Sequence, residues 1–254
     1  MIYICIPTHD EAPTIGLLLW KIRRVMDDFP RDYELLVLDD ASTDGTQDVL
    51  APYARVLPLT VLKNDERLGY ARSVERLVRE AVSRASHPRR DMVVILQADF
   101  SEAPEDIPLL VKRVEGGADL VAATVENRAP DEPRPMRWAR KGFPWLLKRA
   151  AIPEGIPDPL CGFRAYRVAI LKRALADRAG APLLTTDGWA SNVELLLNVA
   201  PYARRSEATD VASRYDRRQR ETRFRAWPTL VQLWELSRRA RRPAAPAEES
   251  DAAA

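Results

Sequence analysis

Three polar turns in this sequence carry most of the residues suited to chemistry, and each turn directly follows an apolar run. The turns are PTHDE at 7–11, DDASTDGT at 39–46 and QADFSEAP at 97–104, and the runs before them are IYICI, ELLVL and MVVIL. Carboxylate and amide oxygens in such turns can accept hydrogen bonds from a ligand or hold a hard divalent cation. Asp99 lies in the third turn, shortly after the apolar run, and Gln97, an amide and not an acid, stands two positions before it.

The apolar runs predict the buried strands of an α/β protein. The alternation of strands and helices is typical of βαβ units, and hence of a mostly parallel central sheet flanked by helices. Ligands of such sheets bind beyond the carboxyl ends of the strands, so the three turns should line one crevice. We take Thr14 as a candidate N-cap and Pro104 as the start of a helix. The expected strands are 2–6, 34–38, 59–63, 92–96 and 119–124, and the expected helices are 15–29, 44–54, 70–85 and 104–115.

Length and composition narrow the class of protein. The chain has 254 residues, of which 46% are apolar, as expected for a globular protein with a full core. A net charge of +2 does not call for a nucleic-acid partner. Two cysteines far apart in sequence favour a reduced cytoplasm over a disulfide scaffold. We expect no signal peptide and no membrane span, because no basic segment leads into an apolar one and no apolar run reaches about 18 residues.

The turns together resemble the nucleotide-sugar half of family 2 glycosyltransferases, which have the GT-A fold. In that family the first strand ends in Pro, an aromatic residue, Asn and Glu, the second in an Asp-Asp-Gly-Ser turn, and a later one in Asp-x-Asp. VLDDASTDGT at 37–46 is the most specific match, and the resemblance covers about residues 1–224. DPLCGFRAYR at 158–167 resembles the Ser/Cys-Gly-Phe-Arg loop of polyprenyl-phosphate sugar synthases. YDRRQRETR at 215–223 resembles their Arg-x-x-Gly-x-Ser-Lys segment more weakly.

The resemblance implies a donor site for a nucleotide sugar. By analogy Pro7, His9 and Glu11 line the base pocket, and Asp40 accepts a hydrogen bond from a ring N–H of the base. His9 replaces the usual aromatic residue, and its ring can still stack on a base. A turn with a helix cap is the alternative role for Asp39 and Asp40. The remaining implied donor contacts are Gln97, Ala98, Asp99 and Arg223.

The departing diphosphate implies a divalent metal, and hard oxygen ligands suit Mg²⁺ or Mn²⁺. Asp99 aligns with the second acid of Asp-x-Asp, which the resemblance makes the metal ligand. Gln97 takes the place of the first acid, and Ser101 stands where the synthases often carry Gln. We therefore expect a retained but weakened metal site with these three ligands. The alternative is that Asp99 caps the helix that follows it.

The resemblance of residues 158–167 to the loop of the polyprenyl-phosphate sugar synthases implies an acceptor site. Gly162 would let the backbone approach a ligand closely, and Arg164 would offer a bidentate fork to phosphate. Arg217 and Arg223 would grip the diphosphate or an acceptor phosphate, although a solvated surface is the alternative for this arginine run. The implied acceptor residues are Cys161, Gly162, Phe163 and Arg164.

The chemistry depends on the acceptor. A lipid phosphate is already anionic at neutral pH, so transfer with inversion needs alignment and leaving-group stabilisation, and Asp99 and Arg217 would supply these. A sugar hydroxyl needs a carboxylate base. Asp187 is the candidate, because it resembles the late acidic position of hydroxyl-acceptor relatives, and a turn before a helix is its alternative role. A third possibility is a nucleotide-sugar-binding protein with weakened catalysis, which Gln97 supports. A dehydrogenase is excluded because no G-x-G-x-x-G follows the first strand.

The leading interpretation is a metal-dependent, inverting hexosyltransferase that moves a sugar, by resemblance mannose, from GDP-mannose or a UDP-hexose to a polyprenyl phosphate. It is most similar to the dolichyl-phosphate mannose synthases. We expect a transferase domain at 1–225, a basic amphipathic helix at 226–242 and a disordered tail at 243–254. The basic, aromatic stretches 137–151 and 224–242 fit either a membrane interface or a packed helix. We expect a cytoplasmic protein with peripheral membrane contact.

Overall fold

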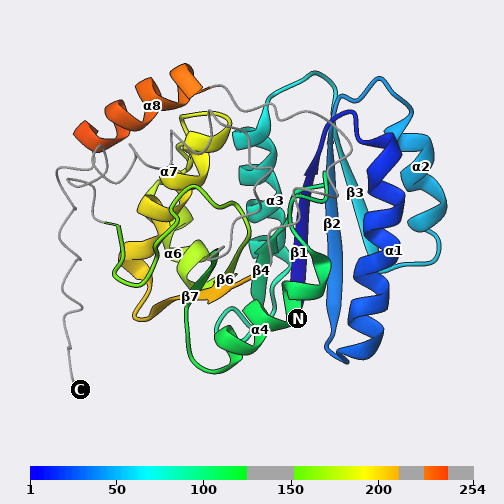
Figure 1. Ribbon diagram of the computed structural model, residues 1–254, viewed down its shortest axis with the longest axis horizontal. Coiled ribbons are helices and arrows are strands. Elements are labelled where there is room, and N and C mark those ends of the chain that lie inside the picture. Colours follow the sequence, from blue (N-terminus) through cyan, green and yellow to red (C-terminus); the bar gives the residue numbers. More distant parts are fainter. Residues whose placement is uncertain (125–151, 212–225, 240–254) are drawn as a thin grey trace.

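Most strands of the central sheet run parallel (Figure 1). The structure is a computed structural model, and it describes residues 1–124, 152–211 and 226–239. Within these residues seven strands form one sheet in the order β3-β2-β1-β4-β6-β5-β7. Neighbours are parallel except around β6, which runs antiparallel to both β4 and β5. The strands are β1 (Ile2–Thr8), β2 (Tyr33–Asp40), β3 (Leu59–Asn64), β4 (Met92–Ile95), β5 (Leu120–Thr124), β6 (Arg164–Arg167) and β7 (Ser206–Asp210).

Register brings the strand ends together. β1 pairs with β2 from Ile2 opposite Tyr33 to Thr8 opposite Asp39, and β2 pairs with β3 up to Asp40 opposite Asn64. The carboxyl ends of β1, β2, β3 and β4 therefore lie at the same edge of the sheet. Because β6 runs the other way, the segment that precedes it also arrives at this edge.

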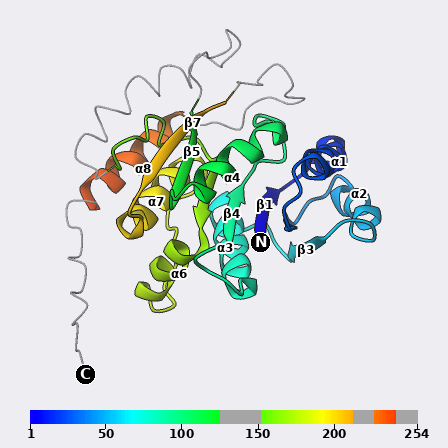
Figure 2. The same ribbon diagram turned by 90° about the horizontal axis from the view of Figure 1, so that it is seen from below.

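Helices cover both faces of the sheet, as expected when the strands are buried on both sides (Figures 1 and 2). α1 (Ala12–Asp28), α2 (Thr46–Tyr53) and α4 (Ile107–Glu115) pack on one face, and the 3₁₀ helix η1 (Pro104–Asp106) leads into α4. α3 (Tyr70–Arg84), α6 (Val168–Asp177) and α7 (Trp189–Val199) pack on the other, with η3 (Ala200–Tyr202) after α7. The longer helices α1 and α3 each bury one apolar stripe against the Ile-, Leu- and Val-rich strands.

α8 (Ala226–Arg239) lies outside these layers and packs on α7. Leu233 and Leu236 of α8 form a small apolar cluster with Ala190, Val193 and Leu160. In Figure 1 α8 lies beside α7, on the opposite side of the molecule from α1 and α2. None of the helices described is long and apolar enough to cross a membrane.

The predicted α/β fold is confirmed, including all five expected strands. Three helix starts differ from expectation. α2 begins at Thr46, two residues after the expected start at 44. α1 begins at Ala12, because Pro13 suits a first helical turn, so Thr14 lies inside the helix and its hydroxyl donates to Glu11. Pro104 starts η1, and the α-helix follows at Ile107. The strands β6 and β7 were not predicted, and the expected tail at 243–254 lies outside the described residues.

Candidate active site

A cavity of about 820 Å³ lies at the carboxyl ends of β1, β2 and β4. This volume is in the range of pockets that hold cofactor-sized ligands. Residues from all three predicted turns line it, so the sequence-based expectation of one crevice is confirmed. Among the described residues the lining comprises Pro7, Thr8, His9, Glu11, Asp40, Arg67, Leu68, Gly69, Tyr70, Ser73, Gln97, Ala98, Asp99, Asp187, Gly188, Trp189, Asn192, Pro228, Thr229 and Gln232.

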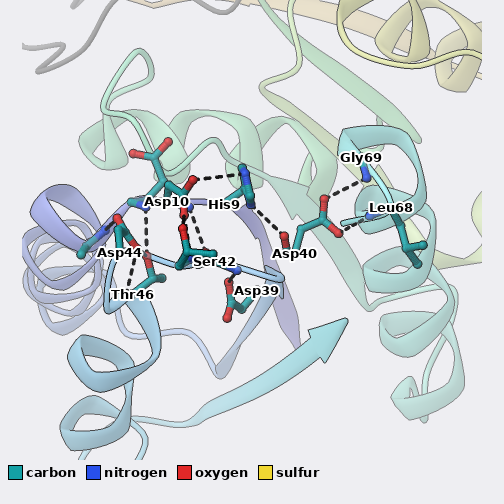
Figure 3. A network of polar contacts seen from close by, with 12 residues as sticks. His9, Asp10, Asp39, Asp40, Ser42, Asp44, Thr46, Leu68 and Gly69 are labelled. Carbon is teal, nitrogen blue, oxygen red and sulfur yellow. Dashed lines mark hydrogen bonds and ion pairs between the residues drawn. The ribbon is translucent and has the colours of Figure 1, made fainter. Parts of the chain in front are cut away.

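The first two turns are bonded to each other (Figure 3). The His9 ring donates from Nδ1 to the carbonyl oxygen of Asp40 at 2.8 Å, and its Nε2 lies 3.3 Å from Asp10 Oδ2. The Asp10 backbone N–H donates to Ser42 Oγ, and Asp10 Oδ1 accepts from the Thr43 N–H, both at 2.9 Å. His9 is thus held on both edges of its ring, at the cavity wall.

Three L-residues at these strand ends have left-handed backbone conformations. Asp10, Ala41 and Phe100 have φ angles of 52°, 54° and 60°, and they follow β1, β2 and β4 respectively. Such angles cost a non-glycine residue about 1–2 kcal/mol. His9, Asp40 and Asp99, the residues directly before these three, line the cavity.

Asp39 and Asp40 have different roles although they are adjacent. Asp39 is fully buried and accepts from the Ser42 N–H at 3.1 Å and from Gln47 Nε2 at 2.6 Å, which is the turn role left open for it. The Asp40 carboxylate points the other way, toward the cavity and the loop at 65–69 (Figure 3).

Asp40 anchors this loop with both of its carboxylate oxygens. Oδ1 accepts from Asn64 Nδ2 at 2.7 Å and from the Leu68 N–H at 2.8 Å, and Oδ2 accepts from the Gly69 N–H at 2.8 Å. Contact between Asp40 and a nucleobase stays a prediction, because each oxygen already has a protein donor. The loop places Arg67, a residue that the sequence analysis missed, on the cavity wall. Applying the strand-end rule to the strand at 59–63 as well would have found it.

The third turn presents Asp99 in a fixed orientation. Asp99 is 3% exposed, and its Oδ1 accepts from the Ser101 N–H at 3.0 Å. The Gln97 N–H donates to Glu102 Oε2 at 2.7 Å. Gln97, Ala98 and Asp99 line the cavity, whereas Ser101 is not among the described lining residues.

These oxygens fit a divalent metal that binds together with a diphosphate. Within the described part of the chain no three His, Cys, Asp or Glu side chains cluster as a preformed metal cage. Mg²⁺ is commonly held by one or two carboxylates, with substrate phosphates and water completing its shell. Asp99 and Gln97, which both line the cavity, offer a carboxylate and an amide oxygen, a donor set of that kind.

The loop at 183–188 closes another side of the cavity and carries Asp187. Asp187 Oδ1 accepts from the Ala71 N–H at the start of α3, at 3.0 Å. A Cβ atom added at Gly69 would lie 2.7 Å from Asp187 Oδ2, so this close approach requires glycine. Asp187 therefore has a helix-capping role, and it also lines the cavity.

Two buried glutamates hold this loop from neighbouring helices. Glu75 of α3 accepts from the Leu183 and Leu184 N–H groups, each at 3.0 Å. Glu194, which lies on α7 as expected, accepts from the backbone and hydroxyl groups of Thr185 and Thr186. These contacts fix the segment that leads into Asp187 and Trp189.

The predicted acceptor residues at 161–164 lie behind the cavity wall and not in its described lining. Arg164 is 1% exposed, and its guanidinium donates to the carbonyl oxygens of Pro159 and Asn192 and to the Tyr166 hydroxyl. Because these contacts hold the loop to α7, we reassign Arg164 from phosphate binding to a structural role. The described cavity lining includes none of Cys161, Gly162, Phe163 and Arg164.

Gly162 packs tightly behind the cavity wall. A Cβ atom at this position would lie 3.1 Å from Asn192 Nδ2 and 3.2 Å from the Tyr70 hydroxyl oxygen. Asn192 and Tyr70 line the cavity and bond to each other at 3.0 Å. Burial raises the pKa of Tyr70, so its hydroxyl is neutral at physiological pH. Arg217 and Arg223 lie outside the described residues.

The sheet order, the helices on both faces and the polar cavity at the strand ends define a glycosyltransferase of the GT-A fold. The chain belongs to glycosyl transferase family 2, whose model matches residues 3–175. The resemblance of the three turns to that family is therefore confirmed.

Curated relatives are similar to this chain over part of their length. The undecaprenyl-phosphate 4-deoxy-4-formamido-L-arabinose transferases of Edwardsiella ictaluri (strain 93-146) and Shewanella sediminis (strain HAW-EB3) are 27% and 28% identical over 177 residues. Each match covers 68% of this chain and 50% of the relative. The chain thus spans about half the length of the curated relatives it matches.

Solved structures share the fold at low sequence identity. Glucosyl-3-phosphoglycerate synthase from Mycobacterium tuberculosis, in complex with Mn²⁺, UDP and glucosyl-3-phosphoglycerate, is 21% identical with a TM-score of 0.59, covering 94% of this chain and 77% of that one. S. aureus TarS 1–349 in complex with UDP-GlcNAc is 17% identical with a TM-score of 0.54, covering 84% and 58%.

Proposed function

We propose that this protein transfers a sugar from a nucleotide diphosphate to the phosphate of a polyprenyl phosphate. The observation that carries the proposal is the convergence of the β1, β2 and β4 turns on one cavity that Arg67 also lines. The curated relatives named as undecaprenyl-phosphate sugar transferases support the acceptor class. Of the two donors expected, GDP-mannose and a UDP-hexose, the solved neighbours that hold UDP or UDP-GlcNAc favour a UDP-linked one.

The donor would lie across the strand ends. Pro7, at the end of β1, and His9 and Glu11, just after it, would contact the base, because all three line the cavity wall. The Arg67 guanidinium would offer its fork to the diphosphate, since a planar fork matches phosphate oxygens. Asp40 would act mainly by holding the loop that carries Arg67.

Asp99 and Gln97 would hold Mg²⁺ or Mn²⁺ at the diphosphate. When bound, the metal would neutralise charge on the leaving group. Asp99 supplies the carboxylate, and its bond from the Ser101 N–H keeps one oxygen in place. Gln97 contributes a neutral oxygen, which binds a hard cation less tightly than a second acid would.

An acceptor phosphate oxygen would attack the anomeric carbon from the side opposite the departing diphosphate. The new C–O bond forms as the bond to the diphosphate breaks, so the anomeric configuration inverts. The nucleophile is already anionic, so no general base is needed, and the protein has to align the two substrates and stabilise the departing diphosphate. Arg217 and Arg223 stay predicted phosphate contacts.

One assay tests the acceptor and the donor together. The full chain is incubated with UDP-hexoses, UDP-pentoses or GDP-mannose, each with and without a short-chain polyprenyl phosphate, and nucleoside diphosphate release is measured. We expect release that depends on the lipid phosphate and on Mn²⁺ or Mg²⁺. Donor binding without release, with every acceptor tested, would support the binding-protein alternative.

Transfer to a sugar hydroxyl is the second candidate, and the position of Asp187 on the cavity wall favours it. A hydroxyl nucleophile needs a base, and loss of a general base typically costs 10²–10⁴-fold in rate. Asp187→Asn can keep the Oδ1 acceptor for the Ala71 N–H. We expect this variant to lose less than about tenfold with a lipid phosphate. A much larger loss would favour the hydroxyl reaction.

A further inference from the structure

The inner side of α8 packs on α7 and also lines the cavity. Thr229, Leu233 and Leu236 are buried, and the two leucines pack in the cluster that joins α8 to α7. Pro228 and Gln232, one turn apart on the same helix, line the cavity together with Thr229. The helix is therefore part of the wall of the proposed donor and acceptor site.

The outer face of α8 exposes large apolar side chains in one stripe. Trp227 is 76% exposed, Val231 41% and Trp234 50%. Their spacing of four and then three residues puts them on one side of the helix, opposite Leu233 and Leu236. The Arg238 guanidinium lies 4.7 Å from the centre of the Trp234 ring and continues the stripe by another turn.

We propose that this outer stripe, Trp227, Val231, Trp234 and Arg238, docks α8 on the surface of an anionic lipid bilayer. Tryptophan is enriched at membrane–water interfaces, where its ring has one apolar and one polar side. Arginine beside it adds attraction to anionic headgroups. The sequence carries four arginines within 238–242, so the charge at this end of α8 has the sign that such lipids attract.

A second copy of this chain fits the stripe less well. The two tryptophans can bury at most about 500 Å² between them, because an aromatic side chain covers about 150–250 Å². A stable protein interface buries about 800 Å² on each partner and involves 20–30 residues a side. A narrow stripe that enters the headgroup region needs no such area.

Docking through α8 would bring the cavity to the lipid phosphate. α8 lines the cavity with one side and carries the stripe on another, so a bilayer at the stripe lies within one helix diameter of the cavity wall. This positioning rests on the proposed function. The membrane contact itself does not, and it can be tested without donor or acceptor.

Vesicle sedimentation with the full chain tests the contact. Binding is measured to phosphatidylcholine vesicles and to vesicles that also contain phosphatidylglycerol, for the natural protein and for Trp227→Ser/Trp234→Ser. Trp20→Ser is the matched control, because Trp20 on α1 is 46% exposed and has Arg24 5.5 Å from its ring, yet lies away from α8. Circular dichroism and nucleotide affinity confirm that each variant is folded.

We expect binding to the anionic vesicles that falls about tenfold or more in the double variant and is unchanged in Trp20→Ser. Arg238→Gln should weaken it about fivefold, the contribution of one basic residue near an anionic surface. Transfer to a detergent-dispersed short polyprenyl phosphate should be unchanged in all variants. Equal binding by the natural protein and the double variant, or no binding by either, would overturn the proposal. So would a natural protein that sediments as a dimer and a double variant that is monomeric.

Discussion

Replacing Asp40 by alanine should destabilise the loop at 65–69 before it affects any ligand. The substitution removes the acceptor for three donors: Asn64 Nδ2, the Leu68 N–H and the Gly69 N–H. Asp40 is 4% exposed, so water cannot easily replace the carboxylate. Each buried donor left unpaired costs about 1–3 kcal/mol. Partial relaxation of the loop would leave a loss of about 3–5 kcal/mol in the free energy of unfolding, a large part of the usual 5–15 kcal/mol.

Asp40→Asn is a milder variant at the same position. An amide keeps one oxygen acceptor and puts an NH₂ group against the remaining donors. We therefore expect Asp40→Asn to lower the free energy of unfolding, but by less than Asp40→Ala does. Urea unfolding at neutral pH, followed by circular dichroism, gives the free energies for all three proteins. Nucleotide affinity, measured by calorimetry under conditions in which each variant is folded, should fall as the loop carrying Arg67 becomes less ordered.

The reasoning fails if Asp40→Ala unfolds within about 0.5 kcal/mol of the natural protein, the range of surface substitutions. If nucleotide binding were lost in that same variant, the carboxylate would act on the ligand directly, as the resemblance first implied.

Three further variants address the metal site and the loop at 183–188. Asp99→Asn should lower transfer by at least about 100-fold, because the metal's charge stabilisation is worth several kcal/mol, and full activity at low Mn²⁺ would exclude Asp99 as a ligand. Gln97→Asp should change donor affinity less than about tenfold, since the added charge also repels the diphosphate; a rescue by orders of magnitude would instead indicate a binding protein. Burial alone would raise the pKa of Glu75, but hydrogen bonds from the Leu183 and Leu184 N–H groups and from Arg79 lower it below its ordinary value. Its stabilisation is therefore full above the ordinary pKa of about 4.3 and is lost as pH falls through the lower folded value. Urea unfolding of Glu75→Gln should show a deficit at pH 7 that shrinks toward pH 3, and a deficit independent of pH would contradict this.

The strands and the three turns could be predicted because their signals are local. A run such as MVVI is apolar on both faces of a covered sheet, and the polar residue that follows must leave the sheet at its edge. The expectation that the turns share one crevice needed only the parallel connectivity. That is why the location of the cavity was predicted correctly even though some side chains lie elsewhere than expected.

What the sequence did not reveal depends on contacts between distant segments. The loop at 183–188 lies at the cavity because Glu75, more than 100 residues earlier, accepts its backbone N–H groups. β6 has the sequence RAYR, and its Arg164 is buried because carbonyl oxygens of Pro159 and Asn192 surround it. No local pattern distinguishes such an arginine from one that binds phosphate.

The left-handed backbone of Asp10, Ala41 and Phe100 has a consequence for the entropy of ligand binding. Glycine would adopt these φ angles without strain, and it stands in the family's Asp-Asp-Gly-Ser turn where this chain has Ala41. A residue with a Cβ atom samples fewer conformations, so each of these turns is confined once the sheet has formed. The ordering of the strand ends is then complete before a ligand arrives, and binding there loses little further chain entropy. Replacing Ala41 by glycine would relieve strain in the folded chain and make this edge of the cavity freer to move.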